Sequence, residues 1–297
     1  MDLLHPQLAA FAAVIEEGSF DGAARRLSVT PSAVSQRIKA LEDRLGHVLV
    51  VRQAPCWPTP AGERLLRRLR PMQALEAEAL ADFLPADENV PRSVAIAVND
   101  DSLQTWFLDG LAELHHRHGY LFDVRVDDQD HTLEMLRDGS VLGAVTAEAK
   151  PVQGCNVHAL GAMRYYPIAS PAFAAAHFRR GLTADALGKA PLIVFNRKDE
   201  LQWRFIRDIT RARLTPPVHY LPTSTGFVDA AGLGLGWCLA PETLIAPAVD
   251  AGRVVVLGKK HWLDVPLYWQ FAAVRSETLE HIGRALREAA KKALRTR

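Results

Sequence analysis

With 297 residues, 48% of them hydrophobic, the chain is long enough for two or three domains with ordinary globular cores. Its formal net charge is only +1, but residues 1–70 carry ten basic against seven acidic side chains. No apolar run approaches the ~20 residues of a membrane span, which excludes a membrane-spanning chain of this kind.

The N-terminal end predicts a helix rather than a targeting segment. Met1 and Asp2 lead into an amphipathic stretch that ends at Glu16 and Glu17, which does not match a secretory signal peptide. The three cysteines are odd in number and widely spaced, so neither a disulfide framework nor a zinc site is indicated. We therefore expect a cytoplasmic protein with reduced thiols, no metal, no cofactor and no contact with a membrane.

The stretch 19–60 predicts a winged helix-turn-helix. Apolar residues recur at helical spacing up to Leu27, and residues 28–30 then interrupt the pattern. Thr30 supplies a capping oxygen for a second helix, and Pro31 suits its first position because the N–H missing there is not needed. The expected buried face of this second helix consists of Val34, Ile38, Leu41 and Leu45.

Gly46 should end the second helix in a left-handed conformation. The apolar run 48–51 predicts a short strand, and Arg52 with the proline-rich segment behind it would complete a wing. The N-terminal end of the second helix is small and polar, which is what a recognition helix offers to base edges. The alternative is a helical hairpin whose polar face is merely solvated.

The runs S-F-D-G-A-A-R-R-L and P-S-A-V-S-Q-R-I-K-A-L-E-D-R-L-G resemble the winged helix-turn-helix of LysR-type transcriptional regulators. The resemblance implies binding to double-stranded DNA at an inverted-repeat operator, with RNA polymerase left open as a further partner. Pro31 departs from the family pattern, where Gln is common at this position. The expected base contacts come from the start of the second helix and the expected phosphate contacts from its basic residues and the wing. These DNA-binding candidates are Thr30, Pro31, Ser32, Ser35, Gln36, Arg37, Lys39 and Arg52.

A third helix is predicted from Thr59 and Pro60, which repeat the cap-and-proline start. Its apolar stripe, at spacings of three and four, consists of Leu65, Leu69, Met72, Ala79 and Phe83. Pro71 should kink it. The resemblance implies that this linker helix pairs with its twin in a homodimer or homotetramer; the alternative is packing on its own chain. The segment PADENVPRS then reads as a hinge.

From Val94, short apolar strands alternate with helices, which favours parallel sheets with right-handed crossovers. The expected fold is α/β, with an N-terminal all-α-type winged helix-turn-helix followed by an effector domain of two doubly wound, Rossmann-like lobes. The expected domains are 1–58 (winged helix-turn-helix), 59–90 (linker helix and hinge) and 91–297 (effector-binding domain), the last divided into lobe I (91–162 and 266–297) and lobe II (163–265).

Ligands of open α/β sheets bind beyond the carboxyl ends of strands, which selects polar residues at predicted strand ends and helix starts. The main effector-binding candidates are Asn99, Asp101, Ser102, Asp128, Thr146, Phe195 and Ser224. Further candidates nearby are Asp100, Asp127, Asp130, Glu148, Asn196, Arg197, Asp199, Thr223 and Thr225.

Two chemistries meet in this set. The helix starts at Ser102 and Ser224 suit a carboxylate, whereas the carboxylates of Asp101 and Asp128 suit an ammonium or guanidinium group. A zwitterion with an extra positive charge would satisfy both. The alternative is that Asp101, Asp128 and Asp130 are helix caps that face solvent.

The runs AVNDDSLQTWFLDGL, VFNRKDELQW and PLYWQF resemble the branch of LysR-type regulators that controls export of lysine and arginine and responds to those amino acids. The resemblance implies an effector domain similar to periplasmic binding proteins, a tetramer on an imperfect inverted repeat and a basic amino acid as effector. Thr225 stands where this branch would have an acidic residue. A LysR-type regulator with a different small-molecule effector stays open.

Other motifs give no catalytic constellation. The glycines of 232–236 follow a predicted helix and precede a strand, which reverses the nucleotide-binding order and favours a helix C-cap. The histidines of 115–118 favour a solvated helix end over a metal site. Cys155 and Cys238 could form a redox pair, but Cys238 favours core packing. Two other classes stay open: an architectural protein that coats or bends DNA, and an enzyme or transport-type binding protein fused to a DNA-binding head.

Overall fold

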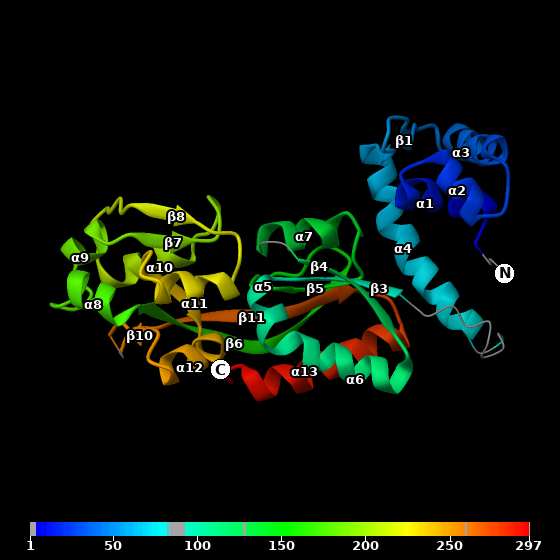
Figure 1. Ribbon diagram of the computed structural model, residues 1–297. Coiled ribbons are helices and arrows are strands. Elements are labelled where there is room, and N and C mark those ends of the chain that lie inside the picture. Colours follow the sequence, from blue (N-terminus) through cyan, green and yellow to red (C-terminus); the bar gives the residue numbers. More distant parts are fainter. Residues whose placement is uncertain (1–3, 82, 84–92, 127–128, 259, 297) are drawn as a thin grey trace.

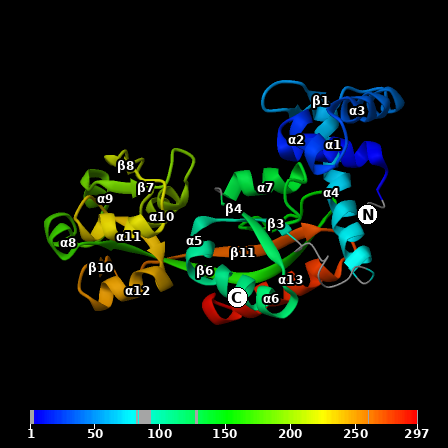
Figure 2. The ribbon, with the colours of Figure 1, turned by 45° about the vertical axis from the view of Figure 1, so that its right-hand side comes forward.

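The computed structural model describes residues 4–81, 83, 93–126, 129–258 and 260–296. A small helical head, a long helix and a two-lobed α/β body follow one another along the chain (Figure 1). The head lies at one end of the molecule, and the two lobes of the body lie side by side in both Figure 1 and Figure 2.

The head is the predicted winged helix-turn-helix. It consists of α1 (Pro6–Glu17), α2 (Phe20–Arg26), α3 (Pro31–Leu45), β1 (Val50–Val51) and β2 (Trp57–Pro58), the last two paired antiparallel. Its core includes Phe11, Val14, Val34, Ile38, Leu41 and Leu49. Leu45 was predicted to join this core but is 44% exposed, because the last turn of α3 extends beyond it.

Helix α4 (Pro60–Ala81) is continuous through Pro71 and leads away from the head. Its first turns pack on the head: Leu66 and Leu69 are buried, and a Cβ on Gly62 would lie 2.3 Å from the carbonyl oxygen of Leu49. Farther along, Met72 is 46% exposed. The apolar stripe of this helix is therefore covered by its own chain only in the first half.

Helix α4 also contacts the body, at the turn that follows α7 (Gln129–Arg137). Gly139 in this turn has a φ of +73°, and a Cβ built on it would lie 2.5 Å from the Cα of Arg67. One helical turn on, burial lowers the pKa of the Arg70 guanidinium, while the nearby carboxylates of Glu16 and Asp138 act in the opposite direction. Backbone lies against backbone at this contact, with charged groups around it.

The first lobe has three layers. Its strands are β3 (Ser93–Val98), β4 (Leu121–Val126) and β5 (Gly143–Thr146), which are parallel, and one end of β11 (Leu263–Ala272), which is antiparallel to β5. Helix α7 covers one face of the sheet, and α6 (Leu108–His118) and α13 (Glu277–Ala293) cover the other (Figure 1). Helix α6 continues a helical segment that begins with α5 (Asp100–Ser102) and the π-helical turn η2 (Leu103–Phe107).

Strands β6 (Cys155–Ala169) and β11 run antiparallel from one lobe into the other, as Figure 1 and Figure 2 both show. The sheets are therefore mixed rather than wholly parallel, because a chain that passes out and back between two lobes must run in opposite directions. Gly161 in β6 has a φ of +137°, and the register shifts opposite it, between Leu267 and Tyr268. The crossing is thus the irregular part of both strands.

The C-terminal segment braces this crossing. Arg295 exchanges two backbone hydrogen bonds of 2.9 Å with Ala162 in β6. Its guanidinium Nη2 lies 2.6 and 2.8 Å from the two carboxylate oxygens of Glu242, at the start of α12 (Glu242–Asp250) in the second lobe.

The second lobe repeats the α/β plan. Its strands are β7 (Leu192–Val194), β8 (Val218–Tyr220), β9 (Cys238–Pro241) and β10 (Val255–Val256), and its helices are α8 (Pro171–His177), α9 (Ala184–Lys189), α10 (Leu201–Ile209), α11 (Thr225–Gly232) and α12. Strands β7 and β8 are parallel, whereas β9 and β10 are antiparallel to β6. Cys238 is fully buried beside Phe227, as expected for a core residue, and burial raises the pKa of its thiol.

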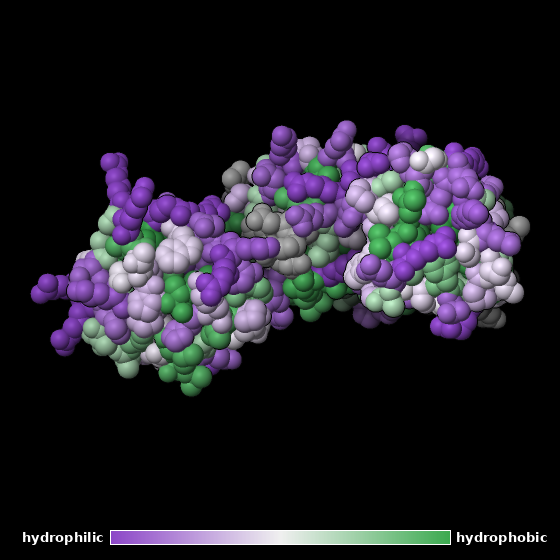
Figure 3. All heavy atoms as spheres, turned by 90° about the horizontal axis from the view of Figure 1, so that it is seen from above, coloured by the Kyte–Doolittle hydropathy of each residue, from purple (hydrophilic) through white to green (hydrophobic). Residues whose placement is uncertain are grey.

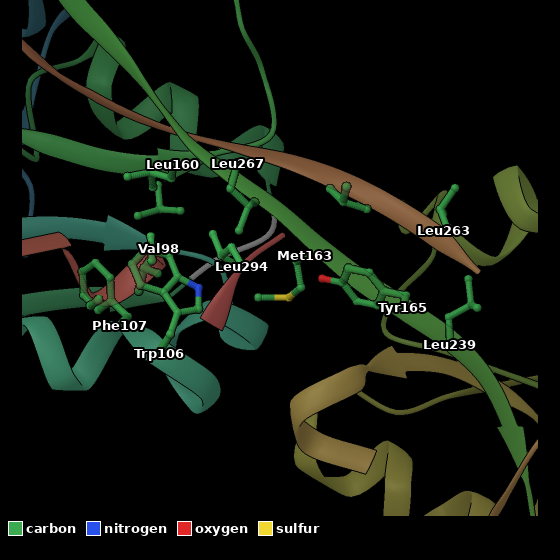
Figure 4. Packing of buried hydrophobic residues seen from close by; sticks show 14 of the residues in the cluster. Val98, Trp106, Phe107, Leu160, Met163, Tyr165, Leu239, Leu263, Leu267 and Leu294 are labelled. Atoms are coloured by element: carbon green, nitrogen blue, oxygen red, sulfur yellow. The ribbon is translucent and has the colours of Figure 1, made fainter. Parts of the chain in front are cut away.

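One hydrophobic core extends through the crossing. Figure 4 shows Trp106 and Phe107 of the first lobe, Met163 and Tyr165 on β6, and Leu239 of the second lobe along one line of contacts. Viewed from above, the surface is mostly hydrophilic, with hydrophobic groups in separate patches (Figure 3). Among the described residues, no helix is both long and apolar enough to cross a membrane.

Candidate functional site

Helices α2 and α3 are joined by a tight turn that fixes the start of α3. Ser28 in this turn has a φ of +52°, and the hydroxyl oxygen of Thr30 accepts a hydrogen bond of 3.2 Å from the amide of Ala33. Pro31 follows as the first helical residue. The N-terminal end of α3 is therefore held by the cap that the sequence predicts.

The predicted DNA-binding residues share the outer side of this helix and the wing. Thr30, Pro31, Ser32, Gln36, Lys39 and Arg52 are exposed, and Ser35 and Arg37 are half-buried. The opposite side of α3 is buried in the head through Val34, Ile38 and Leu41. The outer face thus presents hydroxyl, amide and cationic groups together, the groups that hydrogen-bond to base edges and pair with phosphates.

Arg52 is oriented by two neighbours. Its guanidinium lies 5.2 Å from the centre of the Phe20 ring and 3.8 Å from a carboxylate oxygen of Glu42. The other oxygen of Glu42 accepts hydrogen bonds from the amides of Leu49 and Val50, at 2.8 and 3.3 Å. Glu42 therefore ties α3 to the wing.

The body contains a cavity of about 360 Å³ between its two lobes. Asn99, Asp100 and Asp101 reach it from the end of β3 and the start of α5, and Phe195, Asp199 and Ser224 reach it from the second lobe. Tyr165 lies on β6, where that strand leaves the crossing, with its ring between Met163 and Leu239 (Figure 4). The site therefore draws on both lobes and on the strand that joins them.

The carboxylate of Asp101 lies in the cavity wall against Tyr165. The hydroxyl of Tyr165 donates a hydrogen bond of 2.6 Å to its Oδ2. Burial raises the pKa of Asp101, although this hydrogen bond and one from the Ser224 side chain favour the ionised form. Burial also raises the pKa of Tyr165 well above its usual value, and the charge of Asp101 adds to this effect, so the phenol stays protonated and donates.

Asp199 organises the loop on the opposite wall. Its Oδ2 accepts from the amide of Phe195 at 3.1 Å, and its Oδ1 accepts from the amide of Leu201 at 2.9 Å, at the start of α10. With its amide turned to the favourable orientation, Gln202 donates to both oxygens, at 3.2 and 3.0 Å. Burial raises the pKa of Asp199 as well.

Asp100 spans the cavity. Its Oδ2 accepts a hydrogen bond of 2.9 Å from the backbone amide of Ser224, which precedes α11. Beside it, Asn99 is 7% exposed, and its side-chain oxygen has no hydrogen-bond partner among the described residues. This part of the cavity wall thus contains one buried acceptor without a donor among the described residues.

The predicted effector residues separate into three groups. Asn99, Asp101, Phe195 and Ser224 line the cavity together. Ser102 and Thr146 are buried and are not part of its lining; the Thr146 hydroxyl instead lies 3.5 Å from the side-chain amide of Gln270. Asp128 and Asp127 lie outside the described residues.

Of the further candidates, Asp100, Asn196 and Asp199 line the cavity, and Arg197 does not. Its guanidinium lies 4.9 Å from the centre of the Tyr220 ring. The carboxylate of Asp101 binds the Tyr165 hydroxyl and does not cap a helix, whereas that of Asp199 accepts from the amide of Leu201, the first residue of α10.

Comparison with known proteins assigns both parts of the chain. Residues 5–63 match the model of the bacterial regulatory helix-turn-helix proteins of the LysR family, and residues 88–295 match that of the LysR substrate-binding domain. The chain belongs to the LysR family of transcriptional regulators. It is therefore a DNA-binding regulator and not an enzyme.

Individual members of the LysR family match this chain over almost its full length. A crystal structure of ArgP from Mycobacterium tuberculosis is 47% identical, with a TM-score of 0.89, and the match covers 99% of this chain and 100% of that one. The full-length LysG of Corynebacterium glutamicum with bound effector Arg is 40% identical, with a TM-score of 0.78 and coverage of 98% and 100%. The lysine export transcriptional regulatory protein LysG of Corynebacterium glutamicum is 42% identical over 294 residues, which cover 97% of this chain and 98% of the relative.

The cavity of this LysR-type regulator includes residues that the sequence analysis did not select. Tyr165 and Leu239 lie inside strands, and Gln202 and Arg204 lie inside α10. The sequence analysis selected polar residues at strand ends and helix starts, whereas Tyr165 lines the cavity from within β6, the strand that passes between the lobes. The alternation of buried and partly exposed residues along β6 could have shown the side on which Tyr165 lies, but not the cavity beside it.

Proposed function

We propose that this LysR-type regulator is controlled by a basic amino acid, lysine or arginine, that binds in the cavity between the lobes, and that it controls an amino-acid export gene. The observation that carries the proposal is the acidic lining of the cavity. Asp100, Asp101, Asp199 and Glu200 outnumber the basic residues there, Lys198 and Arg204.

The wall formed by the first lobe is rich in oxygen acceptors, which come from Asn99, Asp100 and Asp101. Asp101 accepts hydrogen bonds from the Tyr165 hydroxyl and the Ser224 side chain, Asp100 is the first residue of α5, and the side-chain oxygen of Asn99 has no donor among the described residues. A buried carboxylate is stabilised by a cation that also donates hydrogen bonds, and ammonium and guanidinium groups do both. The arginine reported with LysG of Corynebacterium glutamicum and the export role in that regulator's name support the same class of ligand and gene.

Basic amino acids are expected to raise the melting temperature of the purified protein. At a concentration of about 100 times the dissociation constant, binding to the folded state alone adds about 2.7 kcal/mol, which corresponds to roughly 5–10 °C for a domain of this size. Differential scanning fluorimetry with L-lysine, L-arginine and L-histidine measures this shift, with L-leucine and L-glutamate as controls. Flat melting curves with all three basic amino acids would refute the proposed effector class.

We further propose that the outer face of α3 reads DNA and that the wing holds phosphates. Support comes from the exposure of Thr30, Ser32, Gln36 and Lys39 on one side of a helix whose start is fixed by a cap. Arg52 is oriented on the wing by Phe20 and Glu42 and would add a phosphate contact there. A homodimer or tetramer would place several such heads on one inverted repeat.

Ser35→Ala is expected to weaken binding to the protein's own promoter fragment several-fold more than binding to unrelated DNA, since it removes a group directed at bases. Lys39→Ala is expected to weaken both and to lower the salt slope by about one. Fluorescence anisotropy at several salt concentrations measures both effects. Lys291→Ala, on α13 and paired with Glu288, is the matched control and should change neither. Equal losses on both DNAs for Ser35→Ala would remove it from the base-reading group.

We propose that residues 1–58 form the DNA-binding domain, residues 59–90 the linker, and residues 91–297 the effector-binding domain. Lobe I (91–162 and 266–297) and lobe II (163–265) would meet at the crossing of β6 and β11. The exposed Met72 on α4 and the exposed Phe83 beyond it support a partner helix at this face, because the head covers only the first turns.

A further inference from the structure

The side chain of Asp100 connects the two lobes across the cavity. It follows β3 in the first lobe, and its Oδ2 accepts the 2.9 Å hydrogen bond from the amide of Ser224 in the second lobe. Its other oxygen accepts from the side-chain amide of Gln104, one helical turn on, at 3.2 Å. Ser224 is 6% exposed, so this hydrogen bond lies inside the cavity wall.

The backbone amide of Ser224 faces the cavity at the start of α11, whereas two of the amides that follow it donate to groups of the same turn. The amide of Gly226 donates to the hydroxyl of Thr223 at 3.3 Å, and the amide of Phe227 donates to the carbonyl oxygen of Ser224 at 3.2 Å. The first amides of a helix favour an anion, and a carboxylate oxygen, that of Asp100, lies against this one. The backbone amide of Ser224 is therefore a binding position for one carboxylate, and we call this position the seat.

A second observation points to a ligand at the same place. The side-chain oxygen of Asn99, the residue before Asp100, is buried in the cavity wall and has no donor within the part of the chain that the structure describes. A buried acceptor without a donor costs free energy unless a bound group supplies the hydrogen. Asn99 and Asp100 together would accept from an ammonium group that enters between them and the second lobe.

We propose that Asp100 and the carboxylate of the effector bind the same backbone amide, that of Ser224, and that effector binding exchanges one for the other. Asp100, once displaced, turns with Asn99 to the ammonium group of the same molecule. This inference rests on the proposed function, because it takes the effector to be an amino acid. A ligand without a carboxylate cannot displace Asp100, and a ligand without a cation gives the displaced Asp100 no partner, so the site selects molecules that carry both.

Chemical rescue with acetate tests the seat without any effector. Asp100→Ala vacates the amide of Ser224, and about 200 mM sodium acetate is expected to raise the melting temperature of this variant by roughly 2 °C or more, relative to sodium chloride of equal ionic strength. The wild type and Asp100→Asn should not respond, because each keeps a side-chain oxygen on the amide. Asp109→Ala, which removes an exposed carboxylate from α6, should not respond either. An equal response of all four proteins, or none in Asp100→Ala, would overturn the seat.

Competition then tests the exchange. In Asp100→Ala, acetate is expected to raise the apparent dissociation constant of L-arginine about threefold or more in calorimetric titrations, and to leave that of agmatine, which lacks the carboxylate, unchanged. An unchanged value for arginine in acetate would show that the two carboxylates do not share the amide.

Ser224→Pro gives a second variant that does not alter Asp100. The φ of Ser224 is −75°, which proline adopts, and the substitution removes the amide hydrogen. The wild type should prefer arginine over agmatine by about tenfold or more, and this variant by less than about threefold. An unchanged preference would contradict the proposal. A wild type that ignores arginine altogether would refute the proposed function, whereas the acetate result on Asp100→Ala would still decide whether the seat exists.

Discussion

The Asp101→Asn protein is expected to bind L-arginine about 100-fold more weakly than the wild type, or worse, while it melts at an equal or higher temperature in the absence of ligand. Removal of one partner of a buried, hydrogen-bonded charge pair costs about 2–5 kcal/mol of binding free energy. The same carboxylate destabilises the folded protein when no cation faces it, because burial raises its pKa. Calorimetric titration measures the first effect and thermal unfolding the second.

The pH dependence of stability provides a further check on Asp101. Because its pKa is higher in the folded than in the unfolded protein, the folded state binds more protons between the two values, and stability falls as pH rises through that window. Lowering the pH from neutral towards the ordinary carboxyl range should therefore stabilise the wild type more than Asp101→Asn. The exposed Asp109→Asn is the matched control. Two results would contradict the role given to Asp101: the same dependence of stability on pH in the wild type and in Asp101→Asn, or a loss of arginine affinity in Asp101→Asn of only about tenfold.

Gly143→Ala is expected to lower the free energy of unfolding by about 3 kcal/mol or more. Gly143 lies in β5, and a Cβ there would meet the ring of Trp269 at 2.1 Å. Trp269 is fully buried in the core and lies on β11, the strand next to β5. Neither the ring nor the strand can therefore move aside without a large loss of packing energy. Chemical denaturation followed by tryptophan fluorescence measures the loss.

Gly188→Ala is the control for this substitution. Gly188 lies inside α9, where a Cβ would make an ordinary contact of 3.6 Å with Leu214. Alanine is the better helix former, so this variant should be as stable as the wild type or more stable by up to about 1 kcal/mol. A Gly143→Ala protein as stable as the Gly188→Ala protein would show that β5 and Trp269 are not closely packed.

The head could be predicted from sequence almost residue by residue, because the residues that begin and end its helices act through their neighbours in the chain. Thr30 caps α3, Pro31 begins it and Gly46 ends it in the left-handed conformation, each for a reason that involves only its neighbours in the chain. The prediction was wrong for Leu45, whose burial depends on where the core ends in space. Helical spacing shows on which face of the helix a side chain lies, but not how far along the helix the core covers that face.

The cavity could be predicted in part. Strand ends and helix starts are visible as changes of pattern, and Asn99, Asp101, Phe195 and Ser224, selected on that basis, do line it. Tyr165 could not be found in this way, because it lies inside β6 and reaches the cavity through the twist and length of the crossing. The bond between Asp100 and Ser224 joins residues 124 positions apart, so no local pattern contains it.

The contact between Gly139 and Arg67 has a consequence for how the head is held. Since no side chain separates the turn from α4, the helix cannot roll about its own axis at this point without lifting off the body. The turn directly follows α7, so a shift of α7 along the sheet would either move α4 and the head with it or separate the two backbones at this contact. A residue with a side chain at position 139 would act as a wedge and change the angle at which the head meets DNA.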